Sequence, residues 1–113
     1  MSRVGAKVAR RPGFKETIFS AAEIAFCESK PLADQHFAAR FAAKEAFLKA
    51  TGRGLTLGYL LRDIEVEVDD LGKPFLKLSG NFAKLAAENG WRHFHITLTH
   101  TATNAGAVVI IET

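Results

Sequence analysis

Apolar residues recur at helical spacing through the first half of the chain. Ser20-Ala-Ala-Glu23 is a capping box, which predicts a short helix that continues to about Ser29 and stops before Pro31. A longer helix is expected from about Ala33 to Thr51, because the apolar spacing continues and Gly52 can cap its C-terminus.

The longer helix is predicted to bury one face and to hold charged side chains at the margin of that face. At about 100° of rotation per residue, the apolar stripe holds Phe37, Phe41 and Leu48, and a ridge of small residues beside it holds Ala38, Ala42 and Ala46. Glu45 and Lys49 fall in the seam between the stripe and the ridge. A carboxylate in that seam is partly shielded from water and needs a cation.

The second half of the chain alternates apolar and polar residues with a period of two, which is typical of strands. "RDIEVEVDD" predicts a half-buried strand, "DDLG" a turn, and the segment with Phe75, Leu76 and Leu78 a returning strand. A third helix is expected from Asn81 to Asn89, and "HFHITLTH" and "AGAVVII" predict two further strands. This order, with short connections, predicts an α+β domain in which an antiparallel sheet packs on the long helix.

The chain of 113 residues is long enough for one domain with a core of its own. We expect that single domain over residues 14–113, preceded by a basic and flexible arm over residues 1–13. The single cysteine, Cys27, allows no internal disulfide and fits a reducing compartment, and no apolar run approaches the length of a membrane span. The prediction is a cytoplasmic protein without a membrane partner.

Positive charge is concentrated near the N-terminus. The formal net charge is +3, and the basic residues that precede the first acid, Glu16, are Arg3, Lys7, Arg10, Arg11 and Lys15. Such a segment could attract nucleic acid, an acidic protein or a phosphorylated ligand. More commonly, a cluster of basic residues of this kind is simply a solvated leader segment.

The segment "FAAKEAFLKATG" allows two interpretations of Glu45. In the first, Glu45 forms an ordinary i, i+4 ion pair with Lys49, which contributes roughly 0.2–0.5 kcal/mol. In the second, Glu45 holds Mg²⁺, an ion that takes one or two carboxylates together with phosphate oxygens. Lys44, Lys49 and Arg53 would then form a positive rim for those phosphates, and the glycines of "TGRGLTLG" would leave backbone N–H groups free to join them.

The segment "RFAAKEAFLKATGRG" resembles the signature helix of the bacterial holo-acyl-carrier-protein synthases, which are small trimeric phosphopantetheinyl transferases. The similarity continues through "TIFSAAEIAFC" before it and "RDIEV", "LGKPFLKLSG", "HITLTHT" and "AGAVVII" after it, and covers nearly the whole chain from Phe14 to Glu112. The resemblance implies the phosphopantetheinyl transferase fold and a homotrimer. It also implies Mg²⁺-dependent transfer of phosphopantetheine from coenzyme A to a serine of apo acyl carrier protein, with release of adenosine 3',5'-bisphosphate.

The resemblance also assigns roles to individual residues. Glu45 matches the metal-binding glutamate and Lys49 the lysine near the coenzyme A phosphates, so these two are the candidate catalytic residues. The positions expected to contact coenzyme A are Lys44, Lys49, Gly52, Arg53, Lys73, Pro74, Thr99 and His100. Thr97 and Thr99 stand where the family usually has serines, and they keep the hydroxyl groups.

One feature of the family is not found in the sequence. Family members begin with a strand whose G-x-D motif supplies an aspartate as the second protein ligand to Mg²⁺. Here Gly5 is followed by Ala6 and Lys7, and no acid occurs before Glu16. We therefore expect that this strand is missing or replaced, that Mg²⁺ binds more weakly than between two carboxylates, and that a sheet edge is left unpaired.

Three functions are compatible with these patterns. The first is a phosphopantetheinyl transferase of the synthase type. The second is a non-catalytic module that binds coenzyme A or the carrier protein, which the absence of a second carboxylate favours. The third is a nucleic-acid binder driven by the basic arm, which ranks well below the others because the arm has no interleaved aromatic residue before Phe14.

Overall fold

The computed structural model describes residues 14–52, 59–100 and 105–113. The predicted arm over residues 1–13, with the missing or replaced strand, and the loop that contains Arg53 lie outside these ranges. The helices are α2 (Phe14–Ile18), α3 (Ala21–Glu28), α4 (Ala33–Thr51), the single 3₁₀ turn η1 (Leu61–Asp63) and α5 (Gly80–Asn89). The strands are β1 (Ile64–Val68), β2 (Pro74–Leu78), β3 (His93–His100) and β4 (Ala105–Glu112).

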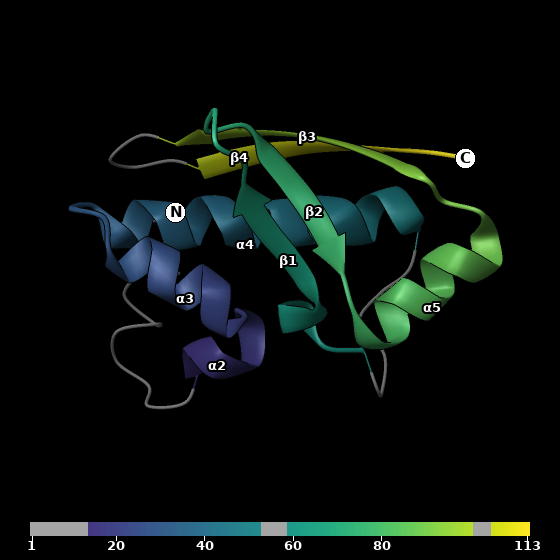
Figure 1. Ribbon diagram of the computed structural model, residues 1–113, viewed down its shortest axis with the longest axis horizontal. Coiled ribbons are helices and arrows are strands. Elements are labelled where there is room, and N and C mark those ends of the chain that lie inside the picture. Colours follow the sequence, from purple (N-terminus) through teal and green to yellow (C-terminus); the bar gives the residue numbers. More distant parts are fainter. Residues whose placement is uncertain (1–13, 53–58, 101–104) are drawn as a thin grey trace.

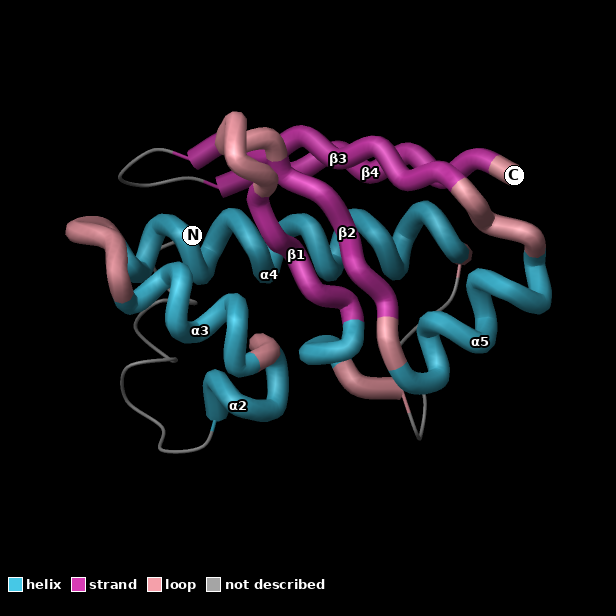
Figure 2. The backbone as a smooth tube through the Cα atoms, in the orientation of Figure 1, coloured by secondary structure: helices cyan, strands magenta, loops and turns pink. Residues whose placement is uncertain are grey.

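Helix α4 is the central element of the domain, and the strands cover it as two separate antiparallel pairs. β3 and β4 run along α4, while the β1–β2 hairpin crosses it at a steep angle, with α3 beside the first half of α4 (Figure 1). The α+β class with antiparallel pairing is as predicted, but the strands form two two-stranded sheets instead of the single sheet that the sequence suggested. Figure 2 shows the β3–β4 pair above α4 and the β1–β2 hairpin crossing in front of it.

Local capping signals mark where α3 begins and where α4 ends. The Ser20 hydroxyl oxygen accepts from the Glu23 N–H at 3.2 Å, and Glu23 Oε1 accepts from the Ser20 N–H at 2.9 Å, which completes the predicted capping box of α3. At the end of α4, Gly52 adopts the left-handed conformation with φ 71°, where a residue without Cβ is favoured. Within the described ranges, no helix combines the length and apolarity needed to cross a membrane.

The β3–β4 pair has one apolar face and one exposed face. Directly opposite residues share a face, and the pairing joins His95 to Ile110 and Thr97 to Val108 on the exposed side. The residues of the other face pack against α4 and the core, and they are Phe94, Ile96, Leu98, Ala107, Val109 and Ile111.

The core consists of three clusters along α4, and each cluster includes one α4 side chain. Their buried members are Ile18, Phe19, Cys27 and Phe37 in the first, Ala43, Val66 and Ile96 in the second, and Phe47, Ile64, Phe82 and Leu85 in the third. Phe47 is completely buried and its ring lies 5.8–6.4 Å from the rings of Phe82, Trp91 and Phe94. The predicted stripe was therefore only partly right, because Phe41 and Leu48 are merely half-buried and Phe47 was not included.

The thiol of Cys27 is completely buried in the first cluster, and burial raises its pKa from 9.0 to about 11. The unfolded chain therefore releases the thiol proton at lower pH than the folded chain, so this group contributes stability below pH 9 that is lost as the pH rises towards 11. We expect the stability advantage of the native protein over Cys27→Ala to shrink by roughly 1–3 kcal/mol between pH 8 and 11. Urea unfolding of both proteins at each pH measures this difference, and parallel pH profiles would contradict it.

Candidate functional site

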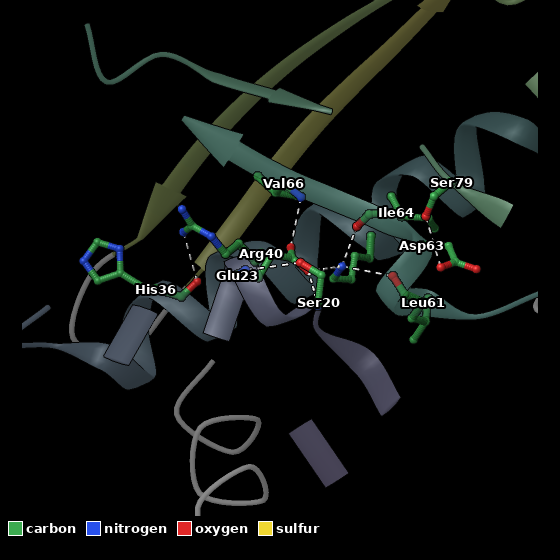
Figure 3. Close-up of polar contacts among 10 residues, drawn as sticks. Ser20, Glu23, His36, Arg40, Leu61, Asp63, Ile64, Val66 and Ser79 are labelled. Carbon is green, nitrogen blue, oxygen red and sulfur yellow. Dashed lines mark hydrogen bonds and ion pairs between the residues drawn. The ribbon is translucent and has the colours of Figure 1, made fainter. Parts of the chain in front are cut away.

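A buried ion pair lies at the junction of α3, α4 and β1. The side chains of Lys44 and Glu23 are both 0% exposed, and Lys44 Nζ donates to Glu23 Oε1 at 2.8 Å. The same ammonium donates to the carbonyl oxygens of Leu61, at 3.0 Å, and Ile64, while the Val66 N–H donates to Glu23 Oε2 at 3.0 Å (Figure 3). Burial lowers the pKa of Lys44, and the charge of Glu23 opposes that shift.

This placement corrects the expectation that Lys44 belongs to a positive rim for phosphates. The ammonium lies in the core, and its contacts to Glu23, Leu61 and Ile64 use three donors, the full number that a lysine has. The sequence showed Lys44 next to Glu45, but it could not show that the ammonium of Lys44 pairs in the interior with a carboxylate 21 residues away.

Glu45 and Lys49 lie four residues apart on α4, on a less buried part of its surface. Glu45 is half-buried and Lys49 is exposed. The described part of the chain shows no ion pair between them, so the first interpretation of Glu45 finds no support in the structure. A half-buried carboxylate without an ionic partner is available to a cation.

The carboxylate of Glu45 fits a hard cation such as Mg²⁺ only in part. Across residues 14–52, 59–100 and 105–113 there is no group of three or more His, Cys, Asp or Glu side chains that could hold a metal ion. Mg²⁺ is commonly held by one or two carboxylates, with water and substrate phosphates as the other ligands. Glu45 can therefore supply one ligand, and most of the others have to come from water or a phosphorylated substrate.

A pocket of about 560 Å³ lies between α4, the β1–β2 turn and β3. Its lining includes the basic side chains Lys30, His36, Arg40 and Lys73, together with apolar residues such as Phe26, Pro74 and Ile96. Lys73 and Pro74 also line an adjoining pocket of about 440 Å³ with Asp69 and His95. A concave surface with several cations and an apolar floor suits an anionic ligand that also has an apolar or aromatic part.

Arg40 is the buried cation of this pocket. Only 2% of the residue is exposed, its Nη1 donates to the His36 carbonyl oxygen at a long 3.4 Å, and its Nε has no partner among the described residues. Its guanidinium carbon lies 4.4 Å from the centre of the Phe26 ring, and Lys30 Nζ lies 4.8 Å from the same ring. Because a buried unsatisfied donor is costly, an anion that accepted from this guanidinium would be bound favourably.

The structure brings together some of the predicted site residues and separates others. Lys73 and Pro74 line the pocket beside Arg40, whereas Glu45, Lys49 and Thr99 line neither of the two pockets described above. Gly52 caps α4, and Thr99 is exposed on the outer face of β3. His100 ends β3, and its side chain, like Arg53, lies outside the described residues.

Among the aromatic and basic residues of the pocket, sequence reasoning identified Lys73 and missed Phe26, Lys30, His36 and Arg40. A signal was present for Arg40, because it lies three residues after Phe37 and therefore on the same buried side of α4. Lys30 and His36 carried no comparable signal, since they flank the turn between α3 and α4 and only the fold places them near Lys73.

Comparison with known proteins shows similarity along nearly the whole chain. A model of the 4'-phosphopantetheinyl transferase superfamily matches residues 1–108. The holo-[acyl-carrier-protein] synthase of Syntrophus aciditrophicus is 46% identical over 99 residues, which are 88% of this chain and 77% of the relative. The synthase of Photobacterium profundum is 42% identical over 108 residues, which are 94% of this chain and 86% of the relative.

Solved structures show the same fold. The holo-[acyl-carrier-protein] synthase of Neisseria meningitidis has a TM-score of 0.84 at 28% identity, and the match covers 98% of this chain and 87% of that one. The synthase of Helicobacter pylori, solved in complex with coenzyme A, has a TM-score of 0.83 at 27% identity and covers 98% of this chain and 92% of that one. These similarities confirm the resemblance seen in the sequence, and the chain belongs to the 4'-phosphopantetheinyl transferase superfamily.

Proposed function

We propose that this protein is a holo-[acyl-carrier-protein] synthase, which transfers the 4'-phosphopantetheine group of coenzyme A to a serine of apo acyl carrier protein. The observation that carries the proposal is the similarity to curated synthases, one of which is 46% identical over 88% of the chain. The Helicobacter pylori synthase of the same fold was solved in complex with coenzyme A, which supports coenzyme A as the donor. We place the protein in the cytoplasm, in agreement with the free thiol of Cys27.

The transfer breaks one phosphorus–oxygen bond of the coenzyme A diphosphate and forms another. The serine oxygen attacks the phosphorus that bears pantetheine, the bridging oxygen leaves with adenosine 3',5'-bisphosphate, and the serine proton passes to a base. Such a reaction is catalysed mainly by positioning and by neutralising the charge of the leaving phosphate. Lys49, exposed on the same side of α4 as Glu45, is our candidate for that neutralising charge.

We propose that Glu45 is the ligand through which this chain holds Mg²⁺. The support is its half-buried carboxylate, to which the described part of the chain gives no ionic partner. When bound, the ion would supply additional positive charge at the diphosphate. The role of Glu45 is therefore to fix the position of that charge relative to Lys49.

We assign the nucleotide end of coenzyme A to the pocket around Arg40. Arg40 and Lys73 supply positive charge for phosphate groups, and Phe26 and Pro74 supply apolar surface for a base or a ribose. The place of Arg40 in the pocket lining supports this assignment, because its one long hydrogen bond, to the His36 carbonyl oxygen at 3.4 Å, leaves other guanidinium donors for phosphate oxygens. Lys73 and Pro74 belong to the turn that the sequence resemblance already placed beside the nucleotide.

We also propose that the protein assembles as a homotrimer through the outer face of β3 and β4. Val108 is 59% exposed and Ile110 is 53% exposed on this face, next to Thr97 and His95 of the paired strand. Neighbouring exposed β-branched side chains on a sheet are typical of a surface that another copy covers.

A non-catalytic binding module is the second candidate. It is favoured by the absence of any acid before Glu16, which leaves Glu45 without the second carboxylate that the sequence resemblance implies. The two candidates differ in whether bound coenzyme A is consumed.

The transfer and the role of Glu45 can be tested together by mass spectrometry. Incubation of the native protein with coenzyme A, Mg²⁺ and apo acyl carrier protein should add the mass of phosphopantetheine to the carrier. Glu45→Gln should lower the rate roughly 100-fold or more, because it removes the charge that holds the ion. Glu88→Gln, an exposed substitution of the same kind on α5, should keep the native rate.

Binding of coenzyme A without any transfer by the native protein would favour the binding module. A native rate for Glu45→Gln would refute the metal-binding role while leaving the transfer itself established.

The pocket assignment can be tested by calorimetry with adenosine 3',5'-bisphosphate. Arg40→Lys and Lys73→Gln should each weaken binding roughly 10-fold, because each removes a charge-assisted contact to phosphate. The affinity should also fall as salt concentration rises. Lys84→Gln, at an exposed lysine of α5 away from the pocket, is the matched control, and unchanged affinity in all three variants would overturn the assignment.

A further inference from the structure

Lys44, the α4 member of the buried pair with Glu23 of α3, lies directly before Glu45. We propose that this pair sets the rotation and the register of α4, and thereby positions Glu45 and Lys49 for the substrate. Glu23 and Lys44 are positioning residues in this account, since their side chains are buried and their contacts are to the protein itself. The consequence for catalysis rests on the proposed function, whereas the effect on the orientation of α4 does not.

The hydrogen bonds of the pair define one position of α4 relative to its neighbours. Lys44 donates to Glu23 on α3 and to the carbonyl oxygens of Leu61 and Ile64 at the start of the first hairpin. Glu23 in turn accepts from the backbone N–H groups of Ser20 and Val66. Hydrogen bonds are directional, so a shift of α4 by one residue or a change in its rotation would break all the contacts of the ammonium together.

The apolar contacts of α4 do not define its rotation equally well. Of its buried apolar residues, Phe37 and Phe47 oppose a change of rotation because each ring packs in its own cluster, whereas Ala38, Ala39 and Ala43 are small. Burial of apolar surface is non-directional and depends mainly on area, so the three alanines distinguish little between neighbouring rotations, and the ion pair adds directional contacts between the two rings. The buried cations Arg40 and Lys44 further weaken the apolar character of the face that meets α3 and the hairpin.

The rotation of α4 determines where Glu45 points. Glu45 follows Lys44 by about 100° around the helix, which takes it from the fully buried position of Lys44 to a half-buried one. Lys49 lies about one turn further on the same side and is exposed. With the ammonium of Lys44 fixed in the core, Glu45 is held at the margin of the core, where a cation can reach it.

Stability alone is a weak explanation for such a pair. Replacing both members of a buried ion pair by uncharged side chains of similar volume is often neutral or stabilising, whereas removing one member leaves an uncompensated buried charge. Stability and positioning can therefore be separated by comparing single and double substitutions.

The test uses the full chain with Lys44→Met, Glu23→Gln and the double variant. Each single variant should unfold at a markedly lower temperature, and the double variant should regain most of that loss. We expect kcat of the double variant to remain lowered by roughly 10-fold or more, with KM for coenzyme A within about threefold of the native value. Leu85→Ala, a buried substitution on α5, is the control for lost stability and should leave kcat unchanged.

A second measurement reports the orientation of α4 without any activity. A thiol introduced by Glu45→Cys is labelled by a thiol reagent in the native background and in the double-variant background, while the buried Cys27 reports unfolding. If the pair positions α4, the labelling rate at residue 45 should change about fivefold or more between the backgrounds. A thiol introduced by Lys84→Cys on α5 should be labelled at the same rate in both.

The outcomes separate positioning from stability and from the proposed function. A double variant with native kcat and a native labelling rate at residue 45 would overturn the proposal. The double variant could also stay less stable than the native protein. Its kcat is then compared with that of a Leu85→Ala protein of equal unfolding temperature. A lower kcat in the double variant would support the proposal, and an equal or higher kcat would overturn it. If the native protein shows no transfer, the proposed function fails, and the labelling rates alone decide whether the pair positions α4.

Discussion

The position of the Lys44 ammonium is the constraint on which the arrangement of the other elements depends. A charged group can be buried only where other groups replace the water that it loses, and here those groups come from α3 and from the start of the first hairpin. Glu23 serves this pair and also caps the helix that contains it, because its Oε1 accepts from the Ser20 N–H. The start of α3 and the docking of α4 are therefore one hydrogen-bonded network, and neither can be changed alone.

Helix α4 directs functionally different side chains to three different surroundings. Arg40 faces the anionic-ligand pocket, Lys44 faces the core, and Glu45 with Lys49 lies at the more exposed margin. Because these residues all lie between positions 40 and 49, a single rigid helix fixes their relative directions. In the proposed reaction the nucleotide and the diphosphate of coenzyme A are held from different sides of the same helix.

The features that could be predicted are those that depend on neighbouring residues. The limits of α3 and α4 follow from Ser20 and Gly52, whose capping geometry is local. The burial of Lys44 could not be foreseen, because it depends on contacts that lie 17 to 21 residues away in the chain. The same holds for the pocket, where Arg40 meets Lys73 only after two hairpins have packed on α4. The apolar stripe was misjudged because Phe47 packs against rings contributed by α5 and β3.

In the proposed function, the charge balance of the candidate site makes the phosphates of the substrate part of the coordination of Mg²⁺. In the portion of the chain that the structure describes, Glu45 is a single carboxylate with no acidic cluster around it, while the pocket is rich in cations. A divalent ion beside one carboxylate keeps a net positive charge, which favours binding only when phosphate oxygens complete its coordination. The cations of the pocket attract the same phosphates. In the proposed function, donor and ion would therefore bind with positive coupling, because each would supply charge that the other lacks, and by reciprocity each would strengthen the binding of the other.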